Sequence, residues 1–277
     1  MARLFYGSFQ SDDARIHYYR TGDLKPPVIL LHGFTDNGLC WNQIPLLLEL
    51  EYDVILWDMR GHGASQTGSQ TISTDLMAED VLRLVEHLQL KQPVLMGHSM
   101  GADIAARAGA RMPKNVRALI LEDPPWFLDP SPMDAQQRAA EFKQRHASIQ
   151  QLKALPIAAL TAFGQQEYPL WDLSEFPQWA KSKHQFNLEF LERFDPDSEP
   201  WQQVVARLQC PGLLFTADNQ RGALVTPQAA ALVMKSWKKG KTVPIAGAGH
   251  SIHREQFMAF YPQLEAFLRK LGKWKPK

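Results

Sequence analysis

The pentapeptide at positions 97–101, Gly-His-Ser-Met-Gly, is the segment whose residue types most directly suggest chemistry. It follows a short apolar run and precedes an alanine-rich stretch with helical periodicity. A strand, a tight turn and a helix in this order hold a serine at the top of the turn, near the positive end of the helix. The two glycines let the backbone turn tightly. The pattern therefore favours Ser99 as a nucleophile over an ordinary residue of a glycine-rich turn.

Histidines matter next, because a serine hydroxyl needs a base to take its proton at neutral pH. His250 follows the last expected strand in a flexible Ala-Gly-Ala-Gly loop, so we expect it to be the base. His253 is its nearest rival, and a role at the start of a helix is the alternative for that residue. His98 adjoins Ser99 and is expected to pack beneath the turn, because neighbouring side chains diverge there.

Short apolar runs alternate with segments of helical periodicity along the chain. The runs cover 28–31, 54–57, 93–96, 116–121 and 211–216, and the helical segments cover 74–90, 102–111, 227–237 and 255–271. Strands that are apolar throughout are covered on both faces, and this alternation is typical of a parallel sheet. We expect 4–9 and 15–20 to form an antiparallel pair at one edge, and 242–246 to add a last strand.

The alternation is interrupted between about 124 and 209, where helical periodicity continues without a convincing strand. We therefore expect a core formed by 1–125 and 200–277, and a helical cap formed by 126–199. Trp126 and Phe127 open the cap and are expected to bind substrate beside an apolar acyl or ring pocket. The other aromatic residues of the cap fit a small core of its own.

Four motifs make the chain resemble the α/β-hydrolase fold superfamily, from residue 28 to residue 271. They are His-Gly-Phe at 32–34, Asp-Met-Arg-Gly-His-Gly at 58–63, the pentapeptide at 97–101, and Gly-Ala-Gly-His at 247–250. The resemblance, to serine esterase and lipase-like members, implies an eight-stranded, mostly parallel sheet flanked by helices. A helical cap is inserted after the sixth strand. Within this frame we expect Arg60 to tie down backbone carbonyls, and His32 and His62 to brace loops.

The acid that orients the base has two candidates. The superfamily usually places it after the strand that follows the insertion, which here is Asp218. The loop at 218–227 departs from the common pattern, in which the acid stands two residues further on, at Gln220. Some members instead use the position after the preceding strand, which is Asp123. We expect the triad to be Ser99, His250 and Asp218, with Asp123 as the alternative acid.

Acyl transfer also needs hydrogen-bond donors for the oxyanion of the tetrahedral intermediate. The backbone N–H of Met100 is one, because it follows the nucleophile at the start of a helix. The resemblance places the other at the backbone N–H of Phe34. Together these residues predict hydrolysis of carboxylic esters through an acyl-serine. Carbon–carbon bond hydrolysis, lactone opening and a ligand sensor with vestigial turnover stay as alternatives. Serine at this position argues against epoxide hydrolases and dehalogenases, which use aspartate.

The composition excludes several other classes. The chain has 30 basic and 29 acidic residues, a net charge of +1, which argues against nucleic acid as a partner. No phosphate-binding or metal-ligand spacing is present, so we expect no cofactor and no metal. Cys40 and Cys210 lie far apart and form no disulfide framework, which fits a reducing compartment. No apolar run is long enough to span a membrane. We expect a cytoplasmic protein that takes a small-molecule ester as its partner, and leave open a homodimer.

Overall fold

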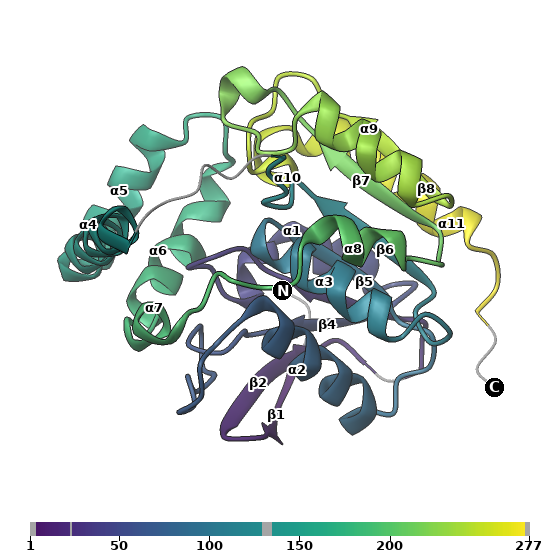
Figure 1. Ribbon diagram of the computed structural model, residues 1–277, viewed down its shortest axis with the longest axis horizontal. Helices are drawn as coiled ribbons and strands as arrows, with labels where there is room; N and C mark the ends of the chain where they lie inside the picture. Colours follow the sequence, from purple (N-terminus) through teal and green to yellow (C-terminus); the bar gives the residue numbers. More distant parts are fainter. Residues whose placement is uncertain (1–3, 23, 129–134, 275–277) are drawn as a thin grey trace.

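The central element is an eight-stranded sheet, seen in a computed structural model that describes residues 4–22, 24–128 and 135–274 (Figure 1). The strands lie in the order β1-β2-β4-β3-β5-β6-β7-β8. Their bounds are β1 (Phe5–Ser11), β2 (Ala14–Arg20), β3 (Pro27–Leu31), β4 (Asp53–Trp57), β5 (Val94–His98), β6 (Ala118–Glu122), β7 (Gly212–Thr216) and β8 (Gly240–Pro244). The β1–β2 and β2–β4 pairs are antiparallel, and the other neighbouring pairs are parallel. The eight-stranded, mostly parallel sheet is confirmed.

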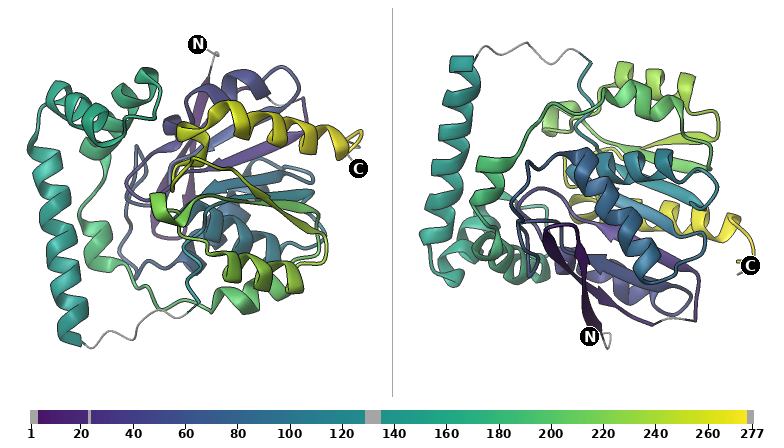
Figure 2. Two further views of the ribbon diagram at one scale, coloured as in Figure 1. Left: turned by 90° about the horizontal axis from the view of Figure 1, so that it is seen from above. Right: turned by 60° about the horizontal axis from the view of Figure 1, so that its bottom comes forward.

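Two hydrophobic cores lie on opposite faces of the sheet, because successive strand residues point to opposite sides. In β3, Ile29 and Leu31 belong to one core, whereas Val28 and Leu30 belong to the other. The first core is covered by α2 (Thr74–His87), α3 (Met100–Arg111), α8 (Trp201–Ala206) and α9 (Pro227–Ser236), and the second by α1 (Gln43–Leu48) and α11 (Phe257–Lys270). Figure 2 shows helices on both sides of the sheet. Coverage of both faces explains why every residue of β3, β4, β5, β6 and β7 is buried.

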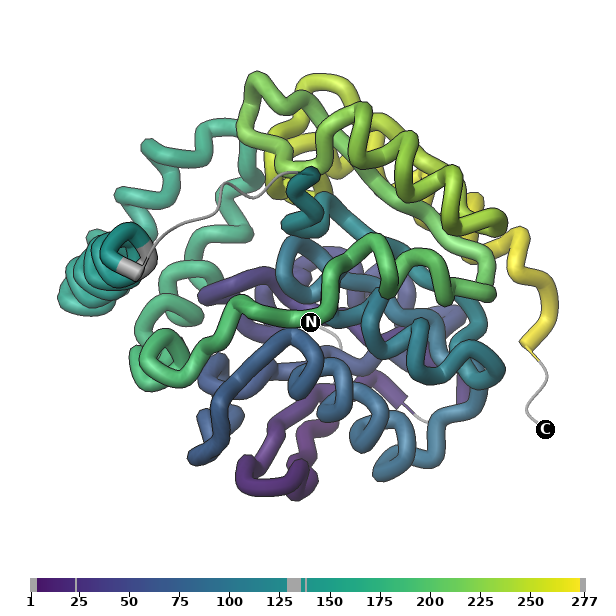
Figure 3. The backbone as a smooth tube through the Cα atoms, in the orientation of Figure 1, coloured from purple at the N-terminus to yellow at the C-terminus, as the bar shows by residue number. Residues whose placement is uncertain are grey.

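The helices α4 to α7, which come between β6 and α8 in the chain, form a layer beside the sheet. Their bounds are α4 (Ala135–Ala154), α5 (Ile157–Glu167), α6 (Phe176–Gln185) and α7 (Glu189–Arg193). Within this layer, Leu160, Trp171, Phe176, Trp179 and Ala180 form an aromatic-rich cluster. Figures 2 and 3 show α4 and α5 on the opposite side of the molecule from the C-terminal end. The helical insertion after the sixth strand is confirmed, and the exact division into 1–125, 126–199 and 200–277 stays a prediction.

Short helical elements follow three of the parallel strands: η1 (Gly38–Trp41) after β3, η3 (Asn219–Arg221) after β7 and α10 (Ile252–Glu255) after β8. A further 3₁₀ helix, η2 (Leu173–Glu175), lies between α5 and α6. The last strand, β8, begins and ends two residues before the expected 242–246. It is an edge strand and only partly buried, so hydrophobicity marks its ends poorly. No helix in the described ranges is long and apolar enough to cross a membrane.

Candidate active site

Ser99 lies between β5 and α3 with strained backbone angles, φ 53° and ψ −122°. The turn is so tight that a Cβ on Gly97 would overlap with the carbonyl group of Gly101, and one on Gly101 with the carbonyl of Leu31. The Ser99 amide donates to the carbonyl oxygen of Glu122 at 2.8 Å, which joins the turn to the end of β6. Strained residues of this kind persist where their surroundings fix them, and they are concentrated at functional sites.

His250 lies in the loop after β8, and its Nδ1 is 2.7 Å from Oδ2 of Asp123. Asp123 follows β6 and is fully buried, with a left-handed backbone at φ 42°. Its carboxylate also accepts hydrogen bonds from the amides of Leu224, at 2.8 Å, and Val225, at 2.9 Å. A carboxylate at Nδ1 keeps the proton on that nitrogen, so Nε2 is left as the acceptor that a general base requires.

Asp218 does not contact His250, and the expectation that it orients the base is corrected here. Its half-exposed carboxylate accepts from the amide of Gly247 at 2.8 Å and lies 4.0 Å from Arg221. Asp218 thus fixes the loop ahead of His250 rather than the imidazole ring. The physical reason is the path of the loop after β7, which turns back so that its amides meet Asp123. Asp123, the alternative, makes the contact instead.

A cavity of about 1510 Å³ opens above these residues. Its lining includes Ser99, His250, Phe34, Met100, Trp126 and Phe127, and so brings together the other predicted site residues. Among the described residues no hydrogen bond joins the Ser99 hydroxyl to His250, and in ligand-free sites such bonds are often long. Trp126 is buried, stacks on Trp201 with ring centroids 5.4 Å apart, and donates to Asp103 at 2.8 Å. Phe127 is half-exposed and free to contact a ligand.

The two expected oxyanion donors belong to segments that adjoin the serine. A Cβ on Gly33 would come within 3.4 Å of the Ser99 Cβ, so the backbone that leads into Phe34 packs directly against the nucleophile. Met100 is the first residue of α3. Within the described parts of the chain, neither the Phe34 nor the Met100 amide donates to a protein acceptor. Both amides are therefore available to a ligand oxygen.

The other histidines of the site are buried supports. His98 packs beneath the turn with its Nε2 3.0 Å from the carbonyl oxygen of His250, as expected. His253, near the start of α10, places Nδ1 2.8 Å from the buried carboxylate of Glu122. Burial alone would raise the pKa of Glu122, but the neighbouring His253 and His98 lower it to about 2. His253 therefore anchors the chain after His250. Its position does not support the alternative that His253 is the base.

The lowered pKa values of His98 and Glu122 make the free energy of unfolding depend on pH, so that acid destabilises the fold. Burial lowers the pKa of His98 from its ordinary 6.5 to about 3, so the unfolded chain binds that proton more readily. The contribution is complete above about pH 6.5 and is lost as the pH falls toward 3. We expect the Tm of the protein to fall between pH 7 and pH 5. The His98→Gln variant, which cannot titrate there, should lose less Tm over that interval. A constant wild-type Tm from pH 7 to pH 4 would contradict this.

Residues from the other motifs brace the surrounding loops. Arg60 is fully buried and donates to Asp80 at 2.6 Å, to Asp13 at 2.7 Å and to the carbonyl oxygen of Ser11 at 2.9 Å. His32 accepts from the Met59 amide at 3.1 Å, and His62 from the Thr35 amide at 3.2 Å. None of the three side chains lines the cavity. Their expected structural roles agree with these contacts.

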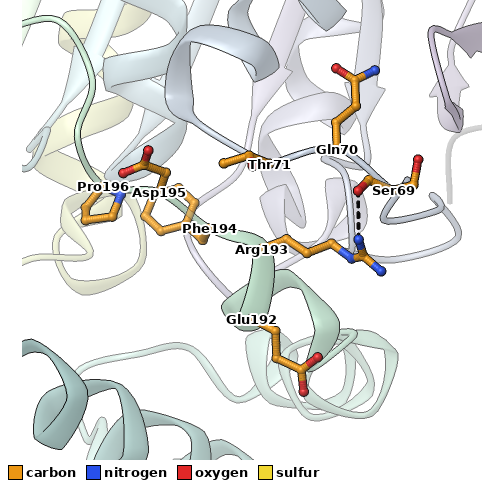
Figure 4. Close-up of a pocket in the computed structure, with 8 residues that line it drawn as sticks. All are labelled: Ser69, Gln70, Thr71, Glu192, Arg193, Phe194, Asp195 and Pro196. Carbon is orange, nitrogen blue, oxygen red and sulfur yellow. Dashed lines mark hydrogen bonds between the residues drawn. The ribbon is translucent and has the colours of Figure 1, made fainter.

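A smaller hollow of about 420 Å³ lies elsewhere, between the loop after β4 and the end of α7 (Figure 4). Arg193 extends beside it to the carbonyl oxygen of Ser69, at 2.7 Å. None of the predicted site residues lines it, so it is not part of the candidate active site. Across the described ranges, no group of three or more His, Cys, Asp or Glu side chains could hold a metal ion.

Comparisons with known proteins complement this geometry. A family model described as alpha/beta hydrolase fold matches residues 26–256. N-formylmaleamate deformylase of Pseudomonas putida is 34% identical over 120 residues, which cover 43% of this chain and 45% of that protein. A Haemophilus influenzae protein named "Putative esterase/lipase" is 24% identical over 251 residues, or 88% of this chain and 84% of that protein. The match to the deformylase thus spans less than half of that protein.

Solved structures show the same fold at low sequence identity. The N-formylmaleamic acid deformylase of Pseudomonas putida aligns with a TM-score of 0.74 and 22% identity, covering 94% of this chain and 100% of that one. E-2-(acetamidomethylene)succinate hydrolase aligns with a TM-score of 0.76 and 18% identity, covering 96% of this chain and 100% of that one. Because the family model matches residues 26–256, which are most of this chain, the chain belongs to the alpha/beta hydrolase fold family.

Proposed function

We propose that the protein is a serine hydrolase that cleaves carboxylic esters through an acyl-serine intermediate. One observation carries the proposal. Ser99, on a strained turn, and His250, whose ring is held by the buried Asp123, line the same cavity. A nucleophile, a base and an orienting acid in this relation are what acyl transfer by serine requires.

In the proposed reaction, Ser99 Oγ attacks the carbonyl carbon of the ester while Nε2 of His250 takes the hydroxyl proton. The carbonyl oxygen becomes an oxyanion that accepts hydrogen bonds from the amides of Met100 and Phe34. The ester C–O bond then breaks, and the imidazolium returns its proton to the leaving alcohol. A water activated by His250 attacks the acyl-serine, and Ser99 is regenerated as the carboxylic acid leaves.

The helices α4 to α7 are proposed to cap the cavity and to select the substrate. Ile149 and Leu152 of α4 and Trp179 of α6 line it together with Trp126 and Phe127, which open the expected cap. Much of the lining is apolar, so this cavity suits an acyl or alcohol group that is itself apolar. Each methylene buried there contributes about 0.8 kcal/mol to binding.

Activity on p-nitrophenyl esters of increasing acyl length, from acetate to octanoate, tests this proposal. We expect repeated turnover and a kcat/KM that rises with acyl length, by up to about fourfold per added methylene. Lactones and a carbon–carbon bond substrate, assayed alongside, separate the alternatives that use the same residues. Turnover limited to one equivalent of every ester would contradict the proposal and favour a ligand sensor.

A further inference from the structure

Helix α6 is joined by polar contacts to the loop that supplies the expected oxyanion donor. Asn37 donates to Gln185 at 2.7 Å and accepts from Gln178 at 2.9 Å, which ties both ends of α6 to the loop after β3. Asn42 donates to Glu175, just before α6, at 2.9 Å. These contacts make α6 a fixed wall of the cavity beside Phe34.

Lys183 is the most deeply engaged residue of this wall. It lies in α6 with 5% of its surface exposed, although it carries a charge. Its ammonium group donates to the carbonyl oxygen of Thr35 at 3.1 Å, to the Thr35 hydroxyl at 2.8 Å and to Asp36 at 2.8 Å. An ammonium group has three N–H donors, and all three are used here. Lys183 therefore has no donor left for a substrate, although it lines the cavity.

Thr35 needs such support because its backbone is strained. Its φ of 62° lies in the left-handed region, which is a genuine outlier for a β-branched residue. Strained backbone persists only where its neighbours over-determine it. Lys183 holds both the carbonyl and the side chain of Thr35, and His62 accepts from its amide. Because Phe34 directly precedes Thr35, the conformation of Thr35 also affects the direction of the Phe34 backbone.

Asp36 extends this support to the segment that carries the base. Its second carboxylate oxygen accepts from Arg254 at 2.9 Å, and Arg254 lies in α10, four residues after His250. Arg254 also donates to the carbonyl oxygen of Cys40 at 3.0 Å. Burial opposes the charge on Asp36, but Arg254 and Lys183 keep the pKa of its carboxyl well below the usual range. One buried carboxylate thus joins α6, the oxyanion loop and the segment after His250.

We propose that Lys183 is a positioning residue for the oxyanion hole, which fixes Thr35 so that the Phe34 amide faces the oxygen of the tetrahedral intermediate. This inference rests on the proposed serine hydrolase function. It predicts an effect on the transition state rather than on substrate binding, because donors placed in advance stabilise charge only as it develops. The inserted helices thereby contribute to catalysis as well as to substrate selection.

The test compares Lys183→Met, which keeps the aliphatic stem but loses the donors, with Lys181→Met on the exposed face of the same helix. We expect Lys183→Met to lower kcat for a p-nitrophenyl ester by about 10- to 100-fold, with KM changed less than about threefold. An aryl trifluoromethyl ketone is the second probe. Ser99 Oγ adds to its carbonyl carbon, the proton passes to His250, and the carbonyl oxygen becomes an oxyanion. Its Ki should rise by the same factor as kcat falls, whereas Lys181→Met should match wild type.

A lower Tm for Lys183→Met with unchanged kcat and Ki would overturn the inference, because a merely structural role moves stability alone. If Lys183→Met does not fold, Thr35→Val removes one of the three acceptors and retains the ion pair with Asp36. It should lower kcat and raise Ki by the same smaller factor, and unchanged values would again overturn the inference. A wild-type protein that neither turns over esters nor binds the ketone would refute the proposed function itself. Wild-type turnover with an unaffected Lys183→Met refutes only the role of Lys183.

Discussion

Replacing Ser99 by alanine is expected to lower kcat for an ester substrate by about 10⁴-fold or more, the usual loss for a catalytic serine. The substitution removes the atom that forms the acyl bond, and no other group of the site can take its place. The fold should be retained, because the turn is held by Gly97 and Gly101 rather than by the hydroxyl. Steady-state kinetics, with circular dichroism and Tm to check folding, measure the effect.

Ser148→Ala is the matched control, because Ser148 also lines the cavity but lies in α4. Its kcat should stay within about threefold of wild type, as expected for a serine outside the reacting set. A well-folded Ser99→Ala protein that retained wild-type turnover would refute the proposed mechanism.

Replacing Asp123 by asparagine is expected to reduce turnover by up to about 10⁴-fold, as for other orienting aspartates. An asparagine can hold the His250 ring in the wrong tautomer, and it cannot stabilise the imidazolium that forms during attack. The same change at Asp218 keeps the side-chain oxygen that accepts from the Gly247 amide. Asp218→Asn should therefore cost less than about tenfold in kcat, in keeping with a support outside the reacting groups.

Kinetics of the two asparagine variants, measured side by side, decide between the carboxylates. If Asp218→Asn proved inactive and Asp123→Asn stayed near wild type, the contact seen between Asp123 and His250 would not be the one used in catalysis. The pair is well matched, since both aspartates follow neighbouring strands of the sheet.

The features that could be predicted from the sequence depend on local patterns. The turn at Ser99 requires glycines at fixed spacing, and the buried strands require short apolar runs, so both were identifiable from residue types alone. His250 was expected from its place in the loop after the last strand, and the Met100 amide from its place after the nucleophile. The Phe34 amide was expected only because of the resemblance to the superfamily. The predicted bounds of the edge strand β8 lie two residues too late in the sequence, because a partly buried strand leaves a weak hydrophobic pattern.

The choice of acid could not be made locally. β6 and β7 are parallel neighbours, so the residues after them, Asp123 and Asp218, emerge at the same sheet edge. Which one meets His250 depends on the path of the loop between η3 and α9, which places the amides of Leu224 and Val225 on Asp123. The only signal in the sequence was the unusual pattern of that loop, with Gln220 where an acid is common.

Lys183 was missed for a related reason. Its partners Thr35 and Asp36 are distant in the sequence, since Asp36 precedes Lys183 by 147 positions. Helical periodicity identifies an insertion but does not show which loop a given lysine meets. A charged residue on the buried side of α6 could have been noticed as unusual, because lysine is rarely buried without a partner.

Mass spectrometry of the protein after reaction with a fluorophosphonate most directly tests the claim that Ser99 is an activated nucleophile. Such a reagent phosphonylates a serine hydroxyl only where a base has activated it, with loss of fluoride. We expect a single stoichiometric adduct on the peptide that contains Ser99, with labelling abolished in Ser99→Ala and slowed in Asp123→Asn. An adduct on another residue, or no adduct on the folded wild-type protein, would contradict the claim.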